Sequence, residues 1–296
     1  MSSKRIGRWT IEFSGNPRIV SAASVVGPKE GEGPLRQCFD VVEQDPMRGE
    51  KTAERAERRF MEDACNLALA QLQLKSEDVD LFLGGDLLNQ EITASFTARM
   101  LQIPFAGLYS ACATIGSALA LGAGLVDGMY AGTVLVAEAS HYQTAERQYR
   151  YPIELNVQRK ATNQWTVTGG GAAVIAKEGD GPKITQATIG RVVDYGLKDT
   201  NDMGSAMAPA AADTLLRHLA DTGHTPGDYD LILTGDLATH GKKMFNHLVS
   251  EAGVTLGGKH QDAGSLIFSP RQNAGAGGSG CACAAVVMFG YVLKEM

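Results

Sequence analysis

The sequence predicts an α/β fold built from two copies of one βαβαβ unit. Short apolar runs alternate with segments of helical period, which favours a mixed or parallel sheet flanked by helices. The strand end DVDLFLGGDL at 78–87 is matched by DYDLILTGDL at 228–237. The helix start SACA at 110–113 is matched by SGCA at 279–282. Two matches in the same order indicate an internal duplication.

The first copy is expected to alternate apolar strands with an amphipathic helix and an Ala-rich buried helix. Turn residues close each apolar run and so mark the strand ends. Strands are expected at Arg18–Val26, Val79–Gly84, Ala106–Tyr109, Thr133–Ala137 and Ala172–Ala176, the amphipathic helix at Ala53–Leu72, and the Ala-rich helix after Cys112. The connection Ser140–Gly169 has no clear period. Its aromatic and arginine residues favour a functional loop over a disordered one.

The second copy is expected to begin after the turn-rich stretch Lys177–Pro182. The chain is therefore predicted to divide into residues 1–178 and residues 179–296. Strands of the second copy are expected at Lys183–Val193, Tyr229–Thr234 and Gly264–Phe268, with helices at Ser205–Asp221 and within Ala282–Leu293.

Composition and charge exclude several classes of function. A net charge of −6 gives no basic field for binding nucleic acid. An anionic ligand would need a locally basic pocket. The five cysteines form no CxxC pair, so no metal site is predicted from their spacing. Their odd number, and a start (MSSKRIGRW) without an apolar core, predict a reducing, cytoplasmic setting.

Several stretches read together resemble one protein family. They are VVGPKEGEGPL, SACATIGSALALGA, SHYQTAERQYRYPIE, QWTVTGGGAAVI, LTGDLATHG and GGSGCACAAVV. In combination they resemble the stage V sporulation protein AD (SpoVAD) family, a branch of the thiolase superfamily. The resemblance runs from about Val20 to Leu293. It implies a thiolase-like fold with five layers, α-β-α-β-α. The second sheet is expected to lack its last strands, because the family continues past the GGSGC helix.

The resemblance also implies a function without catalysis. Family members bind dipicolinic acid, alone or with calcium, and support its uptake into the developing spore. Their place is the cytoplasmic side of the forespore or spore inner membrane, beside the other stage V sporulation protein A membrane proteins. A role in spore germination and a homodimer are implied as well. No cofactor is expected apart from calcium carried together with dipicolinate, and no nucleic-acid partner is expected.

Cys112 is the residue on which the hypothesis of an enzyme depends. A thiol at a helix N-terminus is expected to have a lowered pKa. A ketoacyl synthase would place its first histidine near Gly235 or Asp236, and neither residue serves as an imidazole base. Gly275 stands where a thiolase would have a cysteine, and the Asn that a ketoacyl synthase would have near Gly278 is missing. We therefore predict no catalytic residues. An acyl-transfer enzyme with Cys112 as nucleophile, and His240 as a rescuing base, is the alternative.

Besides a binding protein and an acyl-transfer enzyme, a third hypothesis is a scaffold that only docks to membrane transport proteins. The basic and aromatic segment after Ser140 favours a binding protein over that scaffold, since a dicarboxylate needs cationic and N–H donors. Free N–H groups at the helix start 112–114 suit a carboxylate. The expected ligand-binding residues are Cys112, Ala113, Thr114, His141, Tyr142, Arg147, Tyr149, Arg150, Thr166, Thr168, Gly278 and Ser279.

Two alternatives concern individual charged residues. The arginines of the segment can equally pair with Glu138, Glu146 and Glu154. Asp86 and Asp236 occupy matched turns, where they either cap helices or hold calcium bridged to a ligand. Capping is the expected role, and no metal ligands are predicted.

Overall fold

The computed structural model describes residues 4–149 and 159–295. Its largest sheet has six strands in the order β4-β3-β9-β7-β5-β6. The strands are β3 (Arg18–Val26), β4 (Val41–Val42), β5 (Leu81–Asp86), β6 (Phe105–Gly107), β7 (Thr133–Ser140) and β9 (Gly169–Ala176). All five strands expected in the first copy are present. Only β9 runs antiparallel to its neighbours β3 and β7.

Both faces of this sheet are covered by helices, as its alternating apolar residues require. Leu135 and Ala137 of β7 pack under α2 (Ala53–Gln71) and α3 (Ile92–Leu101). Val134 and Val136 point to the other face, under α4 (Thr114–Asp127) and α9 (Cys281–Val287). A Cβ at Gly171 of β9 would lie 2.7 Å from the Ala285 Cβ, so glycine allows the close approach of α9.

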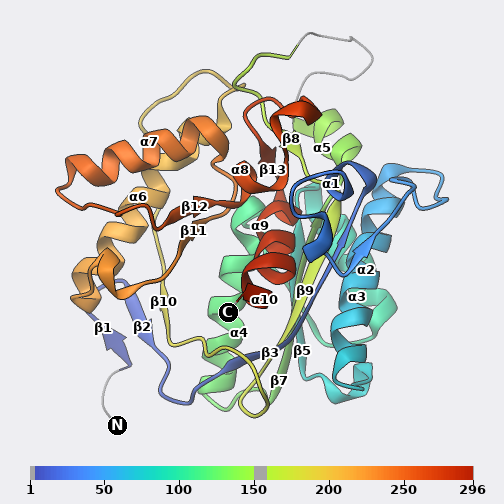
Figure 1. Ribbon diagram of the computed structural model, residues 1–296. Coiled ribbons are helices and arrows are strands. Elements are labelled where there is room, and N and C mark those ends of the chain that lie inside the picture. Colours follow the sequence, from blue (N-terminus) through green and yellow to red (C-terminus); the bar gives the residue numbers. More distant parts are fainter. Residues whose placement is uncertain (1–3, 150–158, 296) are drawn as a thin grey trace.

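The second copy supplies two further layers. β11 (Ile232–Thr234) and β12 (His260–Asp262) form a parallel pair, and α6 (Met203–Thr222) packs against α7 (Ala238–Glu251) beside it. Five layers are visible in Figure 1: α6 with α7, the small β11–β12 sheet, α4 with α9, the large sheet, and α2 with α3. In the described part after residue 178, no strand corresponds to β7 or β9.

The start of the chain lies against the second copy. β2 (Thr10–Glu12) pairs with β1 (Arg5–Ile6) and with β10 (Gln186–Thr188), so that Thr10 faces Thr188. The backbone N–H groups of Trp9 and Thr10 donate to the Asp221 carboxylate at the end of α6, at 2.7 and 2.9 Å.

Two predictions in the second copy were wrong in their bounds or type. Residues expected as a strand at Gly264–Phe268 form the helix α8 (Ala263–Ile267), and the strand β12 precedes it. The Asp262 carboxylate accepts from the Ser265 N–H at 2.9 Å and starts the helix. The strand expected at Lys183–Val193 is limited to β10, which pairs with the three-residue β2. Lys183 adds only a single bridge to Arg18 of β3.

Short elements complete the chain. They are α1 (Pro28–Gly31), α5 (Tyr142–Tyr149), β8 (Trp165–Thr166), β13 (Gly278–Ser279), a π-helical turn at Met288–Val292 and α10 (Leu293–Glu295). In the parts of the chain that are described, no helix has the length and apolar character needed to cross a bilayer.

Candidate functional site

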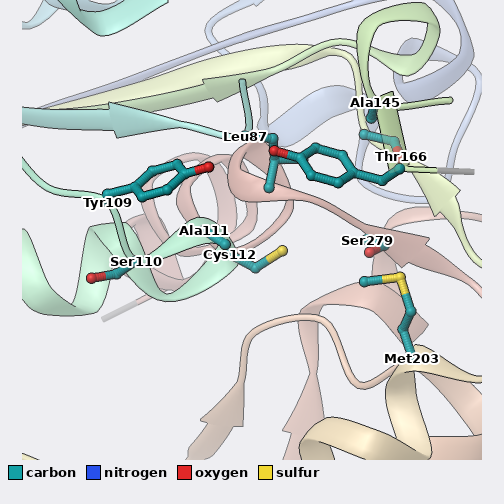
Figure 2. Close-up of a pocket in the computed structure, with 10 residues that line it drawn as sticks. Leu87, Tyr109, Ser110, Ala111, Cys112, Ala145, Thr166, Met203 and Ser279 are labelled. Carbon is teal, nitrogen blue, oxygen red and sulfur yellow. The ribbon is translucent and has the colours of Figure 1, made fainter. Parts of the chain in front are cut away.

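A cavity of about 650 Å³ opens between the two copies of the repeat. Its wall is mostly apolar, with tyrosines and small polar groups. The described lining residues are Leu87, Tyr109, Ser110, Ala111, Cys112, Ala145, Tyr149, Thr166, Met203 and Ser279. Figure 2 shows the Cys112 sulfur pointing from the start of α4 towards the side of the cavity where Ser279 and Met203 lie. Pockets of this size commonly hold small organic ligands.

Cys112 lies on a strained turn that precedes α4. Ala111 has a left-handed backbone, with φ of +48°, a conformation that costs a non-glycine residue about 1 kcal/mol or more. Two of the backbone N–H groups that were expected to be free are hydrogen-bonded within this turn. Ala113 N–H donates to the Ser110 carbonyl and Thr114 N–H to the Ala111 carbonyl. The prediction that these two N–H groups await a ligand carboxylate is therefore wrong.

The next N–H of the helix is also occupied. Ile115 N–H donates to Glu138 Oε2 at 2.8 Å, from the fully buried end of β7. Burial raises the pKa of Glu138 well above its usual value, and the nearby Asp236 adds to the effect. The N-terminus of α4 is thus satisfied by a carboxyl of the protein itself.

The pKa of Cys112 is shifted upwards, opposite to the expectation from its helix position. Burial is the main cause, and the carboxyls of Asp236 and Glu138 add to it. Desolvation and neighbouring negative charge outweigh the dipole of the helix here. Cys112 is therefore held as a thiol at neutral pH.

Asp236 lies directly behind the cavity wall and does not begin its own helix. Its Oδ2 accepts from Gly280 N–H at 3.1 Å and from Ser279 Oγ at 3.3 Å, at the start of α9. Burial raises the pKa of Asp236 to about 6. The start of α7 is served by Asp262, which accepts from Leu237 and Ala238 N–H.

Asp86, at the matched turn of the first copy, has the expected capping role. Its carboxylate accepts from Leu88 N–H at 2.7 Å and from Ala94 N–H at 2.8 Å, in the first turn of α3. In the described ranges, no group of three or more His, Cys, Asp or Glu side chains is arranged to hold a metal ion.

The two copies are joined at the cavity by β8 and β13. These strands are parallel and set Thr166 opposite Ser279, so that both face the cavity. Ser140 Oγ donates to the Val167 carbonyl at 2.8 Å and accepts from Ala282 N–H at 3.0 Å. Gly280, at φ of +95°, leaves the space that this junction needs, since a Cβ there would lie 2.8 Å from the Thr166 methyl.

The arginines expected at the site turn elsewhere. Arg147 donates to Glu54 Oε1 at 2.6 Å on the surface. Arg159 pairs with Glu146 Oε2 at 2.6 Å, which confirms one of the ion pairs considered as an alternative. Glu138 bonds to Ile115 N–H as described above. Arg150 and Glu154 lie outside the described residues. Among the described lining residues there is no Lys, Arg or His.

The other expected site residues divide between the cavity wall and its support. Cys112, Tyr149, Thr166 and Ser279 line the cavity. Gly278 and Thr114 lie one layer behind it: Gly278 pairs with Trp165, and Thr114 Oγ1 donates to the Leu108 carbonyl.

Three further expected residues brace α5. His141 Nε2 lies 2.9 Å from the Pro46 carbonyl oxygen. Thr168 Oγ1 accepts from Tyr142 N–H at 3.0 Å.

His240, the candidate rescuing base, is on α7 and is not among the described lining residues.

Sequence reasoning missed six lining residues. Tyr109, Ser110 and Ala111 directly precede Cys112, and this adjacency was the available signal. Ala145 lies one turn before Tyr149 on α5, on the same helix face. Leu87 follows the capping Asp86. Met203 begins α6 in the second copy, and no sequence pattern connects it to Cys112.

The fold is that of thiolase-like condensing enzymes. An acetamide-bound OleA structure from Xanthomonas campestris matches with a TM-score of 0.64 and 16% identity, over 96% of this chain and 91% of that one. A 3-oxoacyl-(acyl carrier protein) synthase III from Xanthomonas oryzae matches with a TM-score of 0.63 and 17% identity, over 96% and 92%. Likeness at this identity establishes the fold alone.

Sequence comparison identifies the family. The model of the stage V sporulation protein AD family matches residues 7–296. Stage V sporulation protein AD of Bacillus subtilis is 47% identical over 293 residues, which cover 99% of this chain and 87% of that protein. The chain belongs to the stage V sporulation protein AD family, a family of sporulation proteins with a thiolase-like fold.

Proposed function

We propose that this protein binds dipicolinic acid in the cavity beside Cys112 and catalyses no reaction there. The observation that carries the proposal is the inner wall of the cavity, where the Cys112 thiol faces the Asp236 carboxyl in place of an imidazole base. Burial and these neighbours keep the thiol protonated, and only the thiolate is a strong nucleophile. The cavity nevertheless keeps a volume that suits a small ligand.

The lining supports a flat aromatic ligand. Tyr109 precedes α4 and Tyr149 ends α5, and both line the cavity. Tyrosine rings stack on aromatic ligands, and their hydroxyls donate to carboxylates. Membership of a sporulation family supports dipicolinate as that ligand, since the family resemblance implies it.

Calorimetric titration with dipicolinate, with and without calcium, tests this proposal. We expect saturable binding to one site, weakened about tenfold by Tyr149→Ala through the loss of ring contact. Arg147→Ala is the matched control from the same helix and should bind as the parent does. Correctly folded protein that gives no binding heat in either condition would overturn the proposal.

Acyl transfer is the competing activity, because solved structures of this fold include 3-oxoacyl synthases and a thiol lies in the cavity. Incubation with acetyl-CoA followed by intact-mass analysis separates the two activities. We expect no mass gain on Cys112, since its thiol lacks an adjacent imidazole among the described residues. An acetyl group found on Cys112 would contradict a purely binding role.

A homodimer through the first sheet belongs to the same proposal. β6 is an edge strand that pairs only with β5 in the described sheet. Beside it, Ile92, Phe96 and Met100 form an exposed apolar stripe along α3 at a spacing of four residues. A second copy that pairs β6 with β6 would cover both features. Light scattering should give twice the chain mass, and Phe96→Glu should give monomers.

We further propose that the protein acts beside the forespore or spore inner membrane with the other stage V sporulation protein A membrane proteins. Family membership supports this location, and the ligand would then be handed over for uptake and for release at germination. The test is sedimentation with forespore membranes. Retention should be lost with membranes that lack those proteins, whereas retention on bare lipid would argue against protein partners.

A further inference from the structure

We infer that, when a carboxylate ligand enters the cavity, Asp236 takes up one proton and thereby turns the Ser279 and Cys112 donors towards the ligand. This inference rests on the proposed function and assigns Asp236 as a positioning residue for it. Asp236 is 6% exposed and Ser279 is 2% exposed, and only Ser279 of the two lines the cavity. Asp236 therefore acts through its neighbours.

The hydrogen bonds around Asp236 show why the ionised form opposes an anion. Ser279 Oγ, with its single proton, donates to Asp236 Oδ2 at 3.3 Å. The Cys112 thiol is close enough to the same carboxyl for Asp236 to raise the pKa of the thiol. While Asp236 is ionised, both groups direct their protons at it, and they present only lone pairs to the cavity. A ligand carboxylate at this wall would meet acceptors and no donor.

Protonation of Asp236 reverses this arrangement. The carboxyl then carries a proton that it donates to Ser279 Oγ. The Ser279 hydroxyl is released to donate into the cavity, and so is the Cys112 S–H. Gly280 N–H, 3.1 Å from Oδ2, still has a carboxyl oxygen to bond. One proton comes from solvent and none leaves the site, so binding consumes one proton.

The charged surroundings of Asp236 act in the same direction. The titratable groups that face it are Cys112 from the turn before α4, Glu138 from β7, Asp262 from β12 and Cys283 from α9. All four are acids or thiols. An anionic ligand adds further negative charge to this buried wall, which favours the protonated carboxyl. The pKa of Asp236, raised to about 6 by burial, leaves it mostly ionised at pH 7.5 before the ligand binds.

Proton counting by calorimetry tests the inference directly. Calcium-free dipicolinate, a dianion at pH 7.5, is titrated in two buffers of different ionisation enthalpy. We expect uptake of about one proton for each ligand bound. The affinity should fall about tenfold between pH 7 and pH 8, because each proton taken up gives a tenfold change for each pH unit.

Two variants separate Asp236 from the other buried carboxyls. Asp236→Asn keeps a donor towards Ser279, so it should bind with no proton uptake and with an affinity that changes less than about threefold from pH 6 to pH 8. Glu138→Gln is the matched control, because Glu138 bonds to Ile115 N–H instead of Ser279; it should keep the proton uptake. The proton count of the parent protein stands even if a variant fails to fold.

The outcomes distinguish this inference from the function on which it rests. Binding without proton uptake by the parent protein overturns the inference and leaves the proposed function standing. Proton uptake that persists in Asp236→Asn also overturns it. Failure of the folded protein to bind dipicolinate at every pH from 5.5 to 8 overturns the proposed function, and this inference with it.

Discussion

The rings of Tyr142 and Trp165 are stacked, with centroids 4.0 Å apart and planes inclined by 12°. Lys29 Nζ lies 4.0 Å from the centroid of the Trp165 ring, and the Arg159 guanidinium lies 5.0 Å from it. Tyr142 begins α5, whose Ala145 and Tyr149 line the cavity, and Trp165 precedes the lining residue Thr166. The stacked rings therefore hold α5 against the strand that contains Thr166, and these two elements form two walls of the cavity.

Replacement of Trp165 by Ala should loosen both walls. The lost ring contacts and cation–π contacts should lower the free energy of unfolding by about 3 kcal/mol. Dipicolinate affinity should also fall, since Thr166 and Tyr149 lose their common support. Urea unfolding and calorimetric titration measure the two effects. Tyr142→Phe keeps the stacked ring and serves as control. Parent-like stability of Trp165→Ala would show that the stack does not hold the walls together.

Glu30 should make the protein less stable as the pH rises. It is fully buried, its Oε1 accepts from Thr168 N–H, and burial raises its pKa from 4.5 to about 7. Between these values the folded state holds a proton that the unfolded state has lost, so stability falls as pH rises through this window. The full penalty, on the order of 3 kcal/mol, applies above pH 7.

The Glu30→Gln variant removes this ionisation. Its free energy of unfolding should differ little from the parent at pH 4 and should exceed it at pH 8 by up to about 3 kcal/mol. Urea unfolding across this range provides the comparison. Glu32→Gln, at a neighbouring exposed position, is the control and should leave the pH profile unchanged. Parallel profiles for Glu30→Gln and the parent would refute the assignment.

Cys112 should react slowly with alkylating reagents. Burial and the carboxyls of Asp236 and Glu138 raise its pKa, so the thiolate fraction at pH 7.5 is small. Labelling by iodoacetamide, followed by peptide mass spectrometry, should run at least about tenfold slower than in the urea-unfolded protein. Asp236→Asn removes one of the charges and should speed the reaction. Rapid labelling in the native state would instead favour an activated nucleophile.

Arg147 and Arg159 should differ in their cost on replacement. The Arg147–Glu54 pair is exposed, with side chains 46% and 38% accessible, so Arg147→Ala should change stability by less than about 1 kcal/mol. Arg159 pairs with Glu146, which is only 5% accessible, and Arg159→Ala would remove this largely buried ion pair at a cost of about 3 kcal/mol. Thermal unfolding of both variants makes the comparison, and equal losses would contradict it.

Strands with strong local signals were predictable from the sequence. β3 has the predicted bounds, Arg18–Val26, because its β-branched run is bounded by Pro17 and by Gly27-Pro28. The run at Gly264–Phe268 was misassigned, since a short apolar stretch fits a strand and a helix equally well. The capping bond from Asp262 to Ser265 decides between them, and it depends on the position of β12.

The cavity was predictable only in part. Cys112 and Ser279 come from the matched helix starts of the duplication, so sequence symmetry identified both. The connection Ser140–Gly169 has no clear period in the sequence, so the helix α5 within it was not predicted. Residues two apart on a helix point to different faces, and accordingly Arg147 turns to Glu54 and Tyr149 to the cavity. The protonation of Asp236 depends on burial, which only the packed fold creates.

The pairing of β2 with β10 ties the order of folding to the order of synthesis. Thr10 of β2 is synthesised before its partner Thr188 of β10, which follows 178 residues later. β2 can pair with β1 at once, but it must wait for the second copy before it can pair with β10. Contacts so distant in sequence form slowly. A cut between the two copies would leave Asp221 and β10 without the N-terminal strand that they bind. The second copy can thus be expressed separately or exchanged only if β1 and β2 are kept together with it.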